Sequence, residues 1–301
     1  SMDAQLVTCY FLCTLLCVRS EVVGSFIMPH GGIALSPAHF NTTNETAKYE
    51  AWMLHKACLQ AGNLLRQLNP DLIVLSTPHG LADLKQFIFY LNSQGYGRAD
   101  TDNCVCPSCC YNVSVPIDAN TSLNIVQKLQ AFGANVSGLA AYGPSGNDEQ
   151  FPLRWGEVIP LYFMQSQHAQ VMIVSQPSRR YNSDVAMVPE LLQLGKQLYT
   201  ILQTLSERVV VVVSGDLAHT HLPDGPYGYS NASEPYDMAC GLWASTLDTS
   251  ALMVTAAGLV DRALSCGFTG FVLLHGMLQA AGLDNWKADV LANFHPSYYG
   301  M

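Results

Sequence analysis

The feature that most constrains the fold is a run of five valines, Val209–Val213, that ends in a polar stretch. Valine is β-branched and apolar, so such a run is typical of a strand buried on both faces, in a sheet covered by helices on each side. The next residues, SGDLAHTH, include Asp216, His219 and His221. Ligands of open α/β sheets bind just past the carboxyl ends of the strands, so these polar residues are candidates for a functional site.

Two further apolar runs end in the same way. SFIM (25–28) runs into PHGG, which contains His30, and LIVLST (72–77) runs into PHG, which contains His79. The proline before each histidine disfavours continued regular structure, and the glycine after it lets a ligand approach the backbone. The sequence therefore predicts three buried strands that bring His30, His79 and His219 to one edge of a sheet. Two histidines and a carboxylate are typical ligands of a mononuclear non-haem Fe(II) site that reacts with oxygen.

Strand-like and helix-like segments alternate along the chain, which predicts a single-domain α/β sandwich with a central, mostly buried β-sheet flanked by helices. The expected helices are Glu45–Leu68, Thr121–Phe132, Pro189–Leu205, Glu234–Ser245 and Leu259–Ala281, the last interrupted near Gly267 and Gly270. Besides the valine run, the expected strands are Val22–Met28, Leu72–Thr77, Phe87–Leu91, Val158–Met164, Gln170–Ser175 and Ala288–Phe294.

The N-terminal segment predicts a signal peptide over residues 1–20, followed by one domain over 21–301. Leu6–Val18 is uninterrupted and apolar, long enough for a signal-peptide core but short for a stable membrane span. Six N-glycosylation sequons, at Asn41, Asn44, Asn112, Asn120, Asn135 and Asn231, also favour a secreted protein or one in the lumen of the secretory pathway. The alternative is a buried N-terminal helix or strand in a cytoplasmic protein.

Cysteine usage agrees with secretion. Of ten cysteines, four lie in CVCPSCC, within a loop spanning 98–111. Such a cluster predicts a disulfide-stapled loop in a secreted protein and a metal knuckle in a cytosolic one. No second C-x-x-C pair stands at zinc-finger spacing, which favours disulfides. Removing the signal peptide leaves an odd number of cysteines, and Cys266 is the candidate for a free one.

The charge pattern argues against a nucleic-acid partner. The formal net charge is −9, only 12% of residues are charged, and there is no run of lysine or arginine. Phosphate binding needs a basic surface, so nucleic acid is not an expected ligand.

Four motifs occur together in a familiar order: PHGG at His30, LSTPHG at His79, SGDLAHTH at His219 and CGFTGFVLLHGML at Cys266. In order and approximate spacing they resemble the LigB superfamily, which comprises the class III extradiol ring-cleavage dioxygenases and the Memo proteins. The resemblance covers nearly the whole chain after Glu21.

The resemblance implies an oxidoreductase that cleaves a small catechol-type aromatic diol with O2. It implies that His30 and His79 bind Fe(II) and that His219 is the acid/base, with Asp216 and His221 orienting His219 or the substrate. Relatives often form dimers, so a homodimer is one expectation.

The sequence departs from the dioxygenases at the third metal ligand. They take a glutamate from the segment corresponding to Ala263–Gly267, which here reads ALSCG; Asp261 is the nearest carboxylate. Cys266 falls where Memo-type proteins carry a functional cysteine, and a thiolate with two histidines suits copper or zinc as well as iron. Arg154 also stands where relatives often hold an acid.

Two alternatives to an enzyme therefore stay open. One is a non-catalytic, Memo-like, secreted glycoprotein that binds a metal or another ligand. The other is a secreted glycoprotein whose Cys-rich loop recognises a protein. The sequence does not decide among them, nor does it specify the substrate, metal or oligomeric state.

Overall fold

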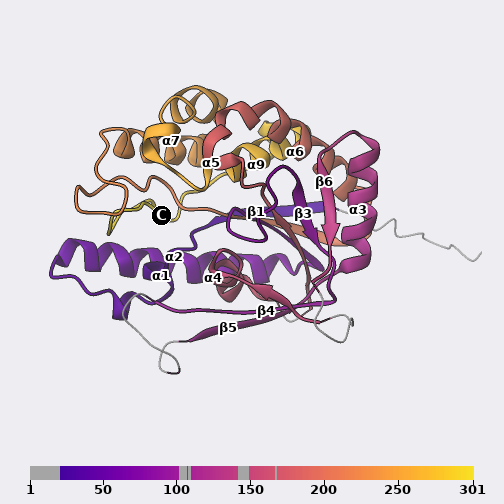
Figure 1. Ribbon diagram of the computed structural model, residues 1–301, viewed down its shortest axis with the longest axis horizontal. Coiled ribbons are helices and arrows are strands. Elements are labelled where there is room, and N and C mark those ends of the chain that lie inside the picture. The colour runs from indigo at the N-terminus through magenta and orange to yellow at the C-terminus, as the bar shows by residue number, and fades with distance from the viewer. Residues whose placement is uncertain (1–20, 102–106, 108–109, 142–148, 167) are drawn as a thin grey trace, which may run out of the picture.

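Six strands form the central sheet of the protein, in the order β1-β9-β2-β8-β3-β6. Figure 1 shows β1 and β3 of this sheet between α2 on one side and α6 and α9 on the other. The computed structural model describes residues 21–101, 107, 110–141, 149–166 and 168–301. The first four strands of this order are parallel, β3 is antiparallel to β8, and β6 is parallel to β3. The strands span Glu21–Met28 (β1), Arg208–Ser214 (β9), Leu72–Thr77 (β2), Gln170–Ser175 (β8), Phe87–Tyr90 (β3) and Val136–Leu139 (β6).

The valine run forms β9, between β1 and β2, and is buried on both faces as predicted. Side chains alternate along a strand, so its valines serve two cores. Val209, Val211 and Val213 pack into one core, and Val210 and Val212 pack into the other.

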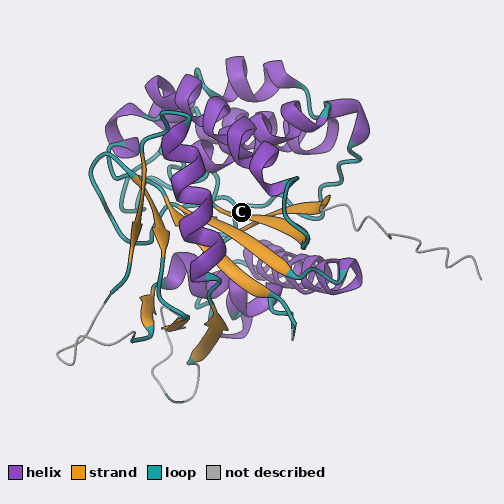
Figure 2. Ribbon diagram, turned by 90° about the vertical axis from the view of Figure 1, so that its right-hand side faces the viewer, coloured by secondary structure: helices purple, strands orange, loops and turns teal. Residues whose placement is uncertain are grey.

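Helices cover both faces of the central sheet (Figure 2). The layer over one face contains α3 (Ala119–Ala131), α6 (Val188–Leu202), α7 (Ser233–Thr246) and α9 (Phe268–Ala281). The layer over the other contains α1 (Gly32–Leu35), α2 (Glu45–Leu68) and α4 (Trp155–Met164). Shorter helical segments are α5 (Arg180–Ser183), α8 (Val260–Ala263), a π-helix (Ala251–Ala256) and 3-10 turns at Pro37–His39, Val185–Met187 and Leu283–Asn285. The predicted sandwich, a buried sheet flanked by helices, is confirmed.

A second, three-stranded sheet packs beside α4, in the order β5-β4-β7. Its strands are β5 (Tyr111–Pro116), β4 (Gln94–Ala99) and β7 (Phe151–Leu153). β4 and β5 are antiparallel, and the segment that joins them carries the Cys-rich motif. Most of that motif lies outside the described residues.

Local capping explains why α2 has the predicted limits. The Asn44 side chain accepts hydrogen bonds from the backbone N–H groups of Thr46 (3.0 Å) and Ala47 (3.3 Å), which caps the first turn. Asn69 ends the helix in a left-handed conformation (φ 46°), directly before Pro70. Strands β2 and β8 also have their predicted limits.

Two predicted strands are wrong. Val158–Met164 belongs to helix α4, whose start is stabilised by a 2.9 Å hydrogen bond from the Arg154 N–H to the Glu157 carboxylate. The error arose because a continuous apolar run shows no alternation of apolar and polar residues. Without that spacing, a buried helix and a buried strand look alike in the sequence. Ala288–Phe294 is irregular: Phe294 and Met301 exchange two backbone hydrogen bonds (3.0 and 2.8 Å), so the segment closes on itself and does not join a sheet.

Within the described part of the chain, no helix combines the length and the hydropathy that a membrane span requires.

Candidate metal centre

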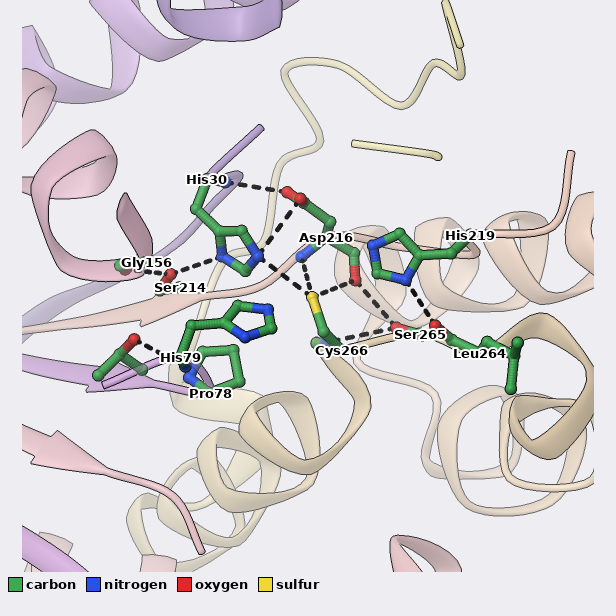
Figure 3. A network of polar contacts seen from close by, with 12 residues as sticks. His30, Pro78, His79, Gly156, Ser214, Asp216, His219, Leu264, Ser265 and Cys266 are labelled. Carbon is green, nitrogen blue, oxygen red and sulfur yellow. Dashed lines mark hydrogen bonds and ion pairs between the residues drawn. The ribbon is translucent and has the colours of Figure 1, made fainter. Parts of the chain in front are cut away.

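Three parallel neighbouring strands end at the same edge of the central sheet, and polar residues follow each of them (Figure 3). His30 follows β1, His79 follows β2, and Asp216 and His219 follow β9, which lies between the other two. The ring centroids of His30 and His79 are 4.7 Å apart, with their planes nearly perpendicular at 86°. The fold therefore brings His30 and His79 together, as their strand-end positions predicted, and places His219 after the strand between theirs.

The tautomer of His30 follows from its hydrogen bonds. The Ser214 hydroxyl oxygen lies 2.6 Å from the Gly156 carbonyl and 2.8 Å from His30 Nδ1. A carbonyl only accepts, so the hydroxyl proton goes to Gly156 and Ser214 accepts the Nδ1–H of His30. The Gly156 carbonyl is available because Pro160, four residues later in α4, has no N–H to bond it. The lone pair that can bind a metal is then on Nε2 of His30.

Cys266 and Asp216 both lie against this nitrogen. The distances from His30 Nε2 to Cys266 Sγ and to the Asp216 carboxylate are each 3.3 Å. The Asp216 carboxylate also accepts the His30 backbone N–H (2.9 Å), and its own backbone N–H points to the Cys266 sulfur (3.3 Å). Cys266 comes just before Gly267, the N-cap of α9, where the helix dipole favours negative charge. A thiol and a carboxylate thus adjoin the two histidines where the sequence lacks the glutamate.

The donor atoms fit a single metal ion. Ligand atoms of His30, His79 and Cys266 all lie within 4.8 Å of one another, as do those of Asp216, His219 and Cys266. Ligand atoms at about 2.0–2.3 Å from a tetrahedral ion are separated from one another by roughly 3.3–3.8 Å. Only a small adjustment is therefore needed for His30, His79 and Cys266 to bind a common ion.

The pKa values of His79 and His30 are shifted in opposite directions. Burial, with the charges of His30 and Arg180 adding to it, lowers the pKa of His79 to about 2, so this ligand is neutral at every working pH. Burial also acts to lower the pKa of His30, but Asp216 and Cys266 outweigh it and the pKa of His30 is raised. A metal that binds Nε2 must displace the proton that these neighbours favour.

The hydrogen bonds of His219 determine which of its ring nitrogens is available as a base. Its Nδ1 lies 2.5 Å from the Leu264 carbonyl, and its backbone N–H donates to the Ala263 carbonyl (2.8 Å). Because the Leu264 oxygen only accepts, Nδ1 carries the proton and the Nε2 lone pair stays free to take one. Leu264 sits in the left-handed region (φ 56°), which for a residue other than glycine costs about 1–3 kcal/mol. Backbone strain therefore positions the carbonyl that orients His219.

The structure separates His221 from this group. Its Nε2 bonds the Asp237 carboxylate (2.8 Å), and its ring stacks on His295 with centroids 4.0 Å apart. The orienting role predicted for His221 stays a prediction. Asp261 is exposed on α8 and is absent from the convergent donor groups of the described residues, which makes it a poor third ligand.

Aromatic side chains at the mouth of the site had no signal in the sequence. Trp155 lies over His79 (centroids 5.2 Å, 31°), and the Tyr181 hydroxyl is 3.5 Å from His79 Nδ1. The Tyr227 ring centroid lies 5.9 Å from that of His219. Trp155, Tyr181 and Tyr227 come from separate segments, so no spacing rule could have joined them. The Ser214–Gly156–Pro160 arrangement was also missed, although a proline inside an apolar helix points to a carbonyl without its usual partner.

The remaining sequence predictions concern the surface and the cysteines. All six sequon asparagines are exposed. The free cysteines among the described residues are Cys58, Cys240 and Cys266, all buried, which agrees with the prediction for Cys266. Cys104, Cys106 and Cys109 lie outside the described residues, so the disulfides of the Cys-rich loop stay a prediction.

Comparison with known proteins shows which family the sequence matches. A family model described as the catalytic LigB subunit of aromatic ring-opening dioxygenase matches residues 25–297. Protein CA_C1420 of Clostridium acetobutylicum is 29% identical over 226 residues, covering 74% of this chain and 45% of that protein, so the chain spans about half the length of this relative. The crystal structure of an uncharacterized protein, JW3007 of Escherichia coli K12, covers 74% of this chain and 82% of its own at 13% identity, with a TM-score of 0.44 that is too low to support any inference.

Proposed function

The chain belongs to the LigB family, and from that premise we propose that it is a metal-dependent enzyme of the extradiol dioxygenase type, which opens the ring of a small catechol-type diol with O2. The observation that carries the proposal is the convergence of His30, His79 and Cys266, with Asp216 and His219 beside them. This arrangement places a candidate metal site beside a base, and oxygen-dependent diol cleavage requires both.

The residues present fit a bound metal, with His30, His79 and Cys266 as ligands and the Asp216 carboxylate within reach of the same position. A redox metal held there supplies a Lewis acid for the two diol oxygens and a centre that reacts with O2. We propose Fe(II) first. The Cys266 sulfur replaces an oxygen ligand, so copper and zinc are the alternatives.

The protein's own part in the reaction is proton transfer and positioning. His219 takes a phenolic proton at Nε2 while the Leu264 carbonyl keeps its ring in place. The buried positions of His30 (3% exposed), Asp216 (3%) and Cys266 (5%) keep water away, which strengthens electrostatic interactions at the site.

The direct test is oxygen uptake. The protein is loaded with Fe(II) without air and then given O2 and a panel of catechols, and oxygen consumption and the absorbance of ring-opened products are followed. His219→Ala is the matched control, because it is expected to bind metal without turnover. An Fe(II)-loaded protein that consumes no oxygen with any diol would sink the proposal.

One observation favours a second candidate, a non-catalytic Memo-like metal-binding glycoprotein. Cys266 contacts His30 where the family's dioxygenases use a carboxylate. Metal analysis of protein purified without added metal separates the candidates. One equivalent of copper or zinc, with no oxygen uptake, favours the second.

We also propose that the protein passes through the secretory pathway, which the exposure of all six sequon asparagines supports. Expression in glycosylating cells should give a mass that falls on enzymatic removal of N-glycans. A chain that carries no sugar at any sequon contradicts this. Size-exclusion chromatography of the same preparation tests the predicted homodimer.

A further inference from the structure

A cavity lies at the free edge of the central sheet, outside the metal centre. Its volume is about 240 Å³, and it extends along β1, which has β9 on one side and no strand of the described residues on the other. Helix α2 forms one wall, and α7 and α9 form the opposite wall. Residues 286–293 form the roof, and Figure 1 shows the C-terminal end of the chain between α7 and α2.

The walls of this cavity are almost entirely apolar. Many of the side chains that line it are buried, among them Met28, Leu54, Trp243, Phe271 and Leu274. Of the described residues that line it, the charged ones are Lys287 and Asp289, which lie on the roof and pair with each other at 3.6 Å. Their side chains are 88% and 69% exposed, so neither charge is buried in the cavity. An apolar void of about 150 Å³ stays dry and binds small apolar molecules, so this larger one favours an apolar ligand over water.

Two buried cysteines line the cavity, and their chemistry does not make it a reactive site. Cys58 lies on α2 and Cys240 lies on α7, in opposite helix layers. Burial, with the charge of Asp216 adding to it, raises the pKa of the Cys58 thiol to about 12, and burial raises the pKa of Cys240 as well. Both thiols are therefore protonated at neutral pH and act as apolar surface, not as nucleophiles.

The cavity is long and narrow. Along β1 and the residue after it, the lining runs from Ser25 to Pro29, which in an extended chain is roughly 13 Å. Along α9 it runs from Phe271 to Leu278, about two turns of helix or roughly 10 Å. A space of about 240 Å³ drawn out over this length suits an unbranched chain better than a compact ring system.

The roof provides a route into the cavity. Backbone hydrogen bonds hold the residues at its two ends, Trp286 and Phe294. Between them, residues 287–293 make no backbone–backbone hydrogen bond within the described part of the chain, and the Asn293 side chain donates one hydrogen bond of 2.9 Å to α7. Leu291 lines the cavity and is also 37% exposed to solvent. A single layer of chain with so few hydrogen bonds can open locally and admit a ligand.

The cavity adjoins the metal centre without including it. Its lining contains Pro29 and Gly215, which directly precede His30 and Asp216 in the chain. None of the donor residues of the metal centre lines the cavity. A ligand in the cavity therefore contacts the backbone beside these donors and leaves their side chains free to bind a metal.

We propose that this cavity binds one unbranched alkyl chain, such as that of a medium-chain fatty acid, with the chain between α2 and α7 and the polar head at the roof. Because the walls are apolar, the chain supplies most of the binding free energy and the head group contributes little. The site is separate from the proposed ring-cleaving centre and does not depend on that function.

Calorimetric titration of the metal-free protein with fatty acids of increasing length, from hexanoate to tetradecanoate, tests the proposal below the micelle concentration of each acid. Affinity should rise about fourfold for each added methylene, which is the effect of burying that group, and should stop rising once the cavity is full. Decanol has the same chain as decanoate and no charge, and it should bind with an affinity within a few-fold of that of decanoate.

Two substitutions fill the cavity from opposite walls. Ala57 on α2 and Ala244 on α7 both line it and are half-buried. Ala57→Phe and Ala244→Phe should each lower the affinity for decanoate by at least about 10-fold, because the new ring occupies the space of the chain. Ala280→Phe is the matched control, since Ala280 is also half-buried, near the end of α9, and lies outside the lining. It should bind decanoate as the wild-type protein does.

Three results would overturn the proposal: no saturable binding of any of these chains, an affinity that still rises at tetradecanoate, or a decanol affinity far below that of decanoate. Undiminished decanoate binding by the folded Phe variants would do the same, and either variant alone gives this answer if the other does not fold. Protein loaded with Zn(II) should bind decanoate as well as metal-free protein does, and displacement of decanoate by zinc would place the acid at the metal centre instead. A lack of oxygen uptake by the iron-loaded protein would count against the proposed enzyme and leave the chain-binding site standing.

Discussion

Two histidine clusters meet in the loop after β9 and differ in what their geometry allows. One contains His30, His79 and His219 with Asp216 and Cys266, and we call it the metal cluster. The other contains His221, Asp237 and His295, and we call it the clamp cluster. His219 and His221 are separated by one residue, yet they belong to different clusters.

In the metal cluster, the histidine nitrogens that can bind a metal or take a proton face the other donor groups. Each proton-bearing nitrogen of His30 and His219 is bonded to an oxygen of the scaffold, which leaves the other nitrogen for a metal or a substrate proton. The His30 and His79 rings are nearly perpendicular (86°), so their edges can converge on a point.

In the clamp cluster, the histidine nitrogens are not arranged to bind one ion. The rings of His221 and His295 are stacked within 7° of parallel at 4.0 Å, and Nε2 of His221 is bonded to Asp237. A nitrogen lone pair lies in the plane of its ring, so two parallel rings at this separation cannot both meet an ion about 2 Å away. Asp237 also accepts the Ala218 N–H (2.9 Å), so this cluster braces the loop after β9. Ring orientation, more than the number of histidines, decides which cluster can do chemistry.

The largest expected effect distinguishes the clusters by metal content. His30→Ala or His79→Ala should lower metal affinity by more than about 100-fold, because each removes a ligand and not merely a residue that supports one. His295→Ala should leave affinity unchanged and cost at most about 1 kcal/mol of stability, because it removes a half-exposed ring that stacks on His221 and a surface ion pair with Glu234. Elemental analysis with circular dichroism checks both. Metal loss in His295→Ala, or collapse of the fold in both His30→Ala and His79→Ala, would contradict the assignment of metal binding to the metal cluster.

The next effect concerns rate. His219→Ala should reduce oxygen uptake by roughly 10²- to 10⁴-fold, the usual contribution of a general base, with the metal still bound. His221→Ala should leave the rate within a few-fold of wild type. Steady-state oxygen consumption at equal metal loading measures both, and equal losses in the two variants would mean that the histidines act together.

For the clamp cluster the main effect is on stability. His221→Ala should lower the free energy of unfolding by roughly 3 kcal/mol at neutral pH, because it leaves the buried Asp237 carboxylate without its partner. Burial raises the pKa of Asp237 and the His221 hydrogen bond opposes this rise, so in the variant the pKa rises further.

The pH dependence of that loss has a definite sign. A carboxyl whose pKa is raised by folding stabilises the fold below its unfolded pKa, and this contribution is lost as pH rises through the folded value. The penalty of His221→Ala should therefore be largest at pH 7 and shrink toward pH 4. Urea unfolding across this range measures it, and a penalty that grows toward acid would contradict the assignment.

The smallest effect tests how the metal cluster is supported. Ser214→Ala removes the group that accepts the His30 Nδ1–H and satisfies the Gly156 carbonyl, and metal affinity should fall by roughly 10- to 100-fold. Ser233→Ala is the control, since it is an equally buried hydroxyl that bonds Thr220 (2.6 Å), outside the metal cluster. Competition with a chelator measures both affinities; the same loss in both variants would mean a general loosening.

Much of this could be predicted because the signals are local. A valine run marks its own strand, and Pro-His-Gly after β1 and β2 marks where each ends, so parallel pairing alone brings His30 and His79 to one edge. The metal cluster was thus recognisable from short motifs, and the family resemblance rested on the same residues.

What escaped prediction depends on contacts between distant segments. Cys266 was predicted as a partner of the two histidines through the family resemblance alone. It meets His30 across 236 positions, through the packing of α9 against β9, and no local pattern in ALSCG encodes this contact. Asp237, 16 positions along the chain, determines which way His221 turns. The segment that forms α4 is apolar along almost its whole length. Its sequence therefore shows neither the 3.6-residue spacing of a helix nor the alternation of a strand.

The order of strands has a consequence for synthesis. β9 inserts between β1 and β2 although it is made last of the three, and Cys266 emerges later still. A growing chain on the ribosome therefore exposes His30 and His79 without the strand that holds them side by side. Metal capture has to wait until almost the whole domain has been translated, so shortened chains that end before Cys266 should be unable to retain an ion at this position.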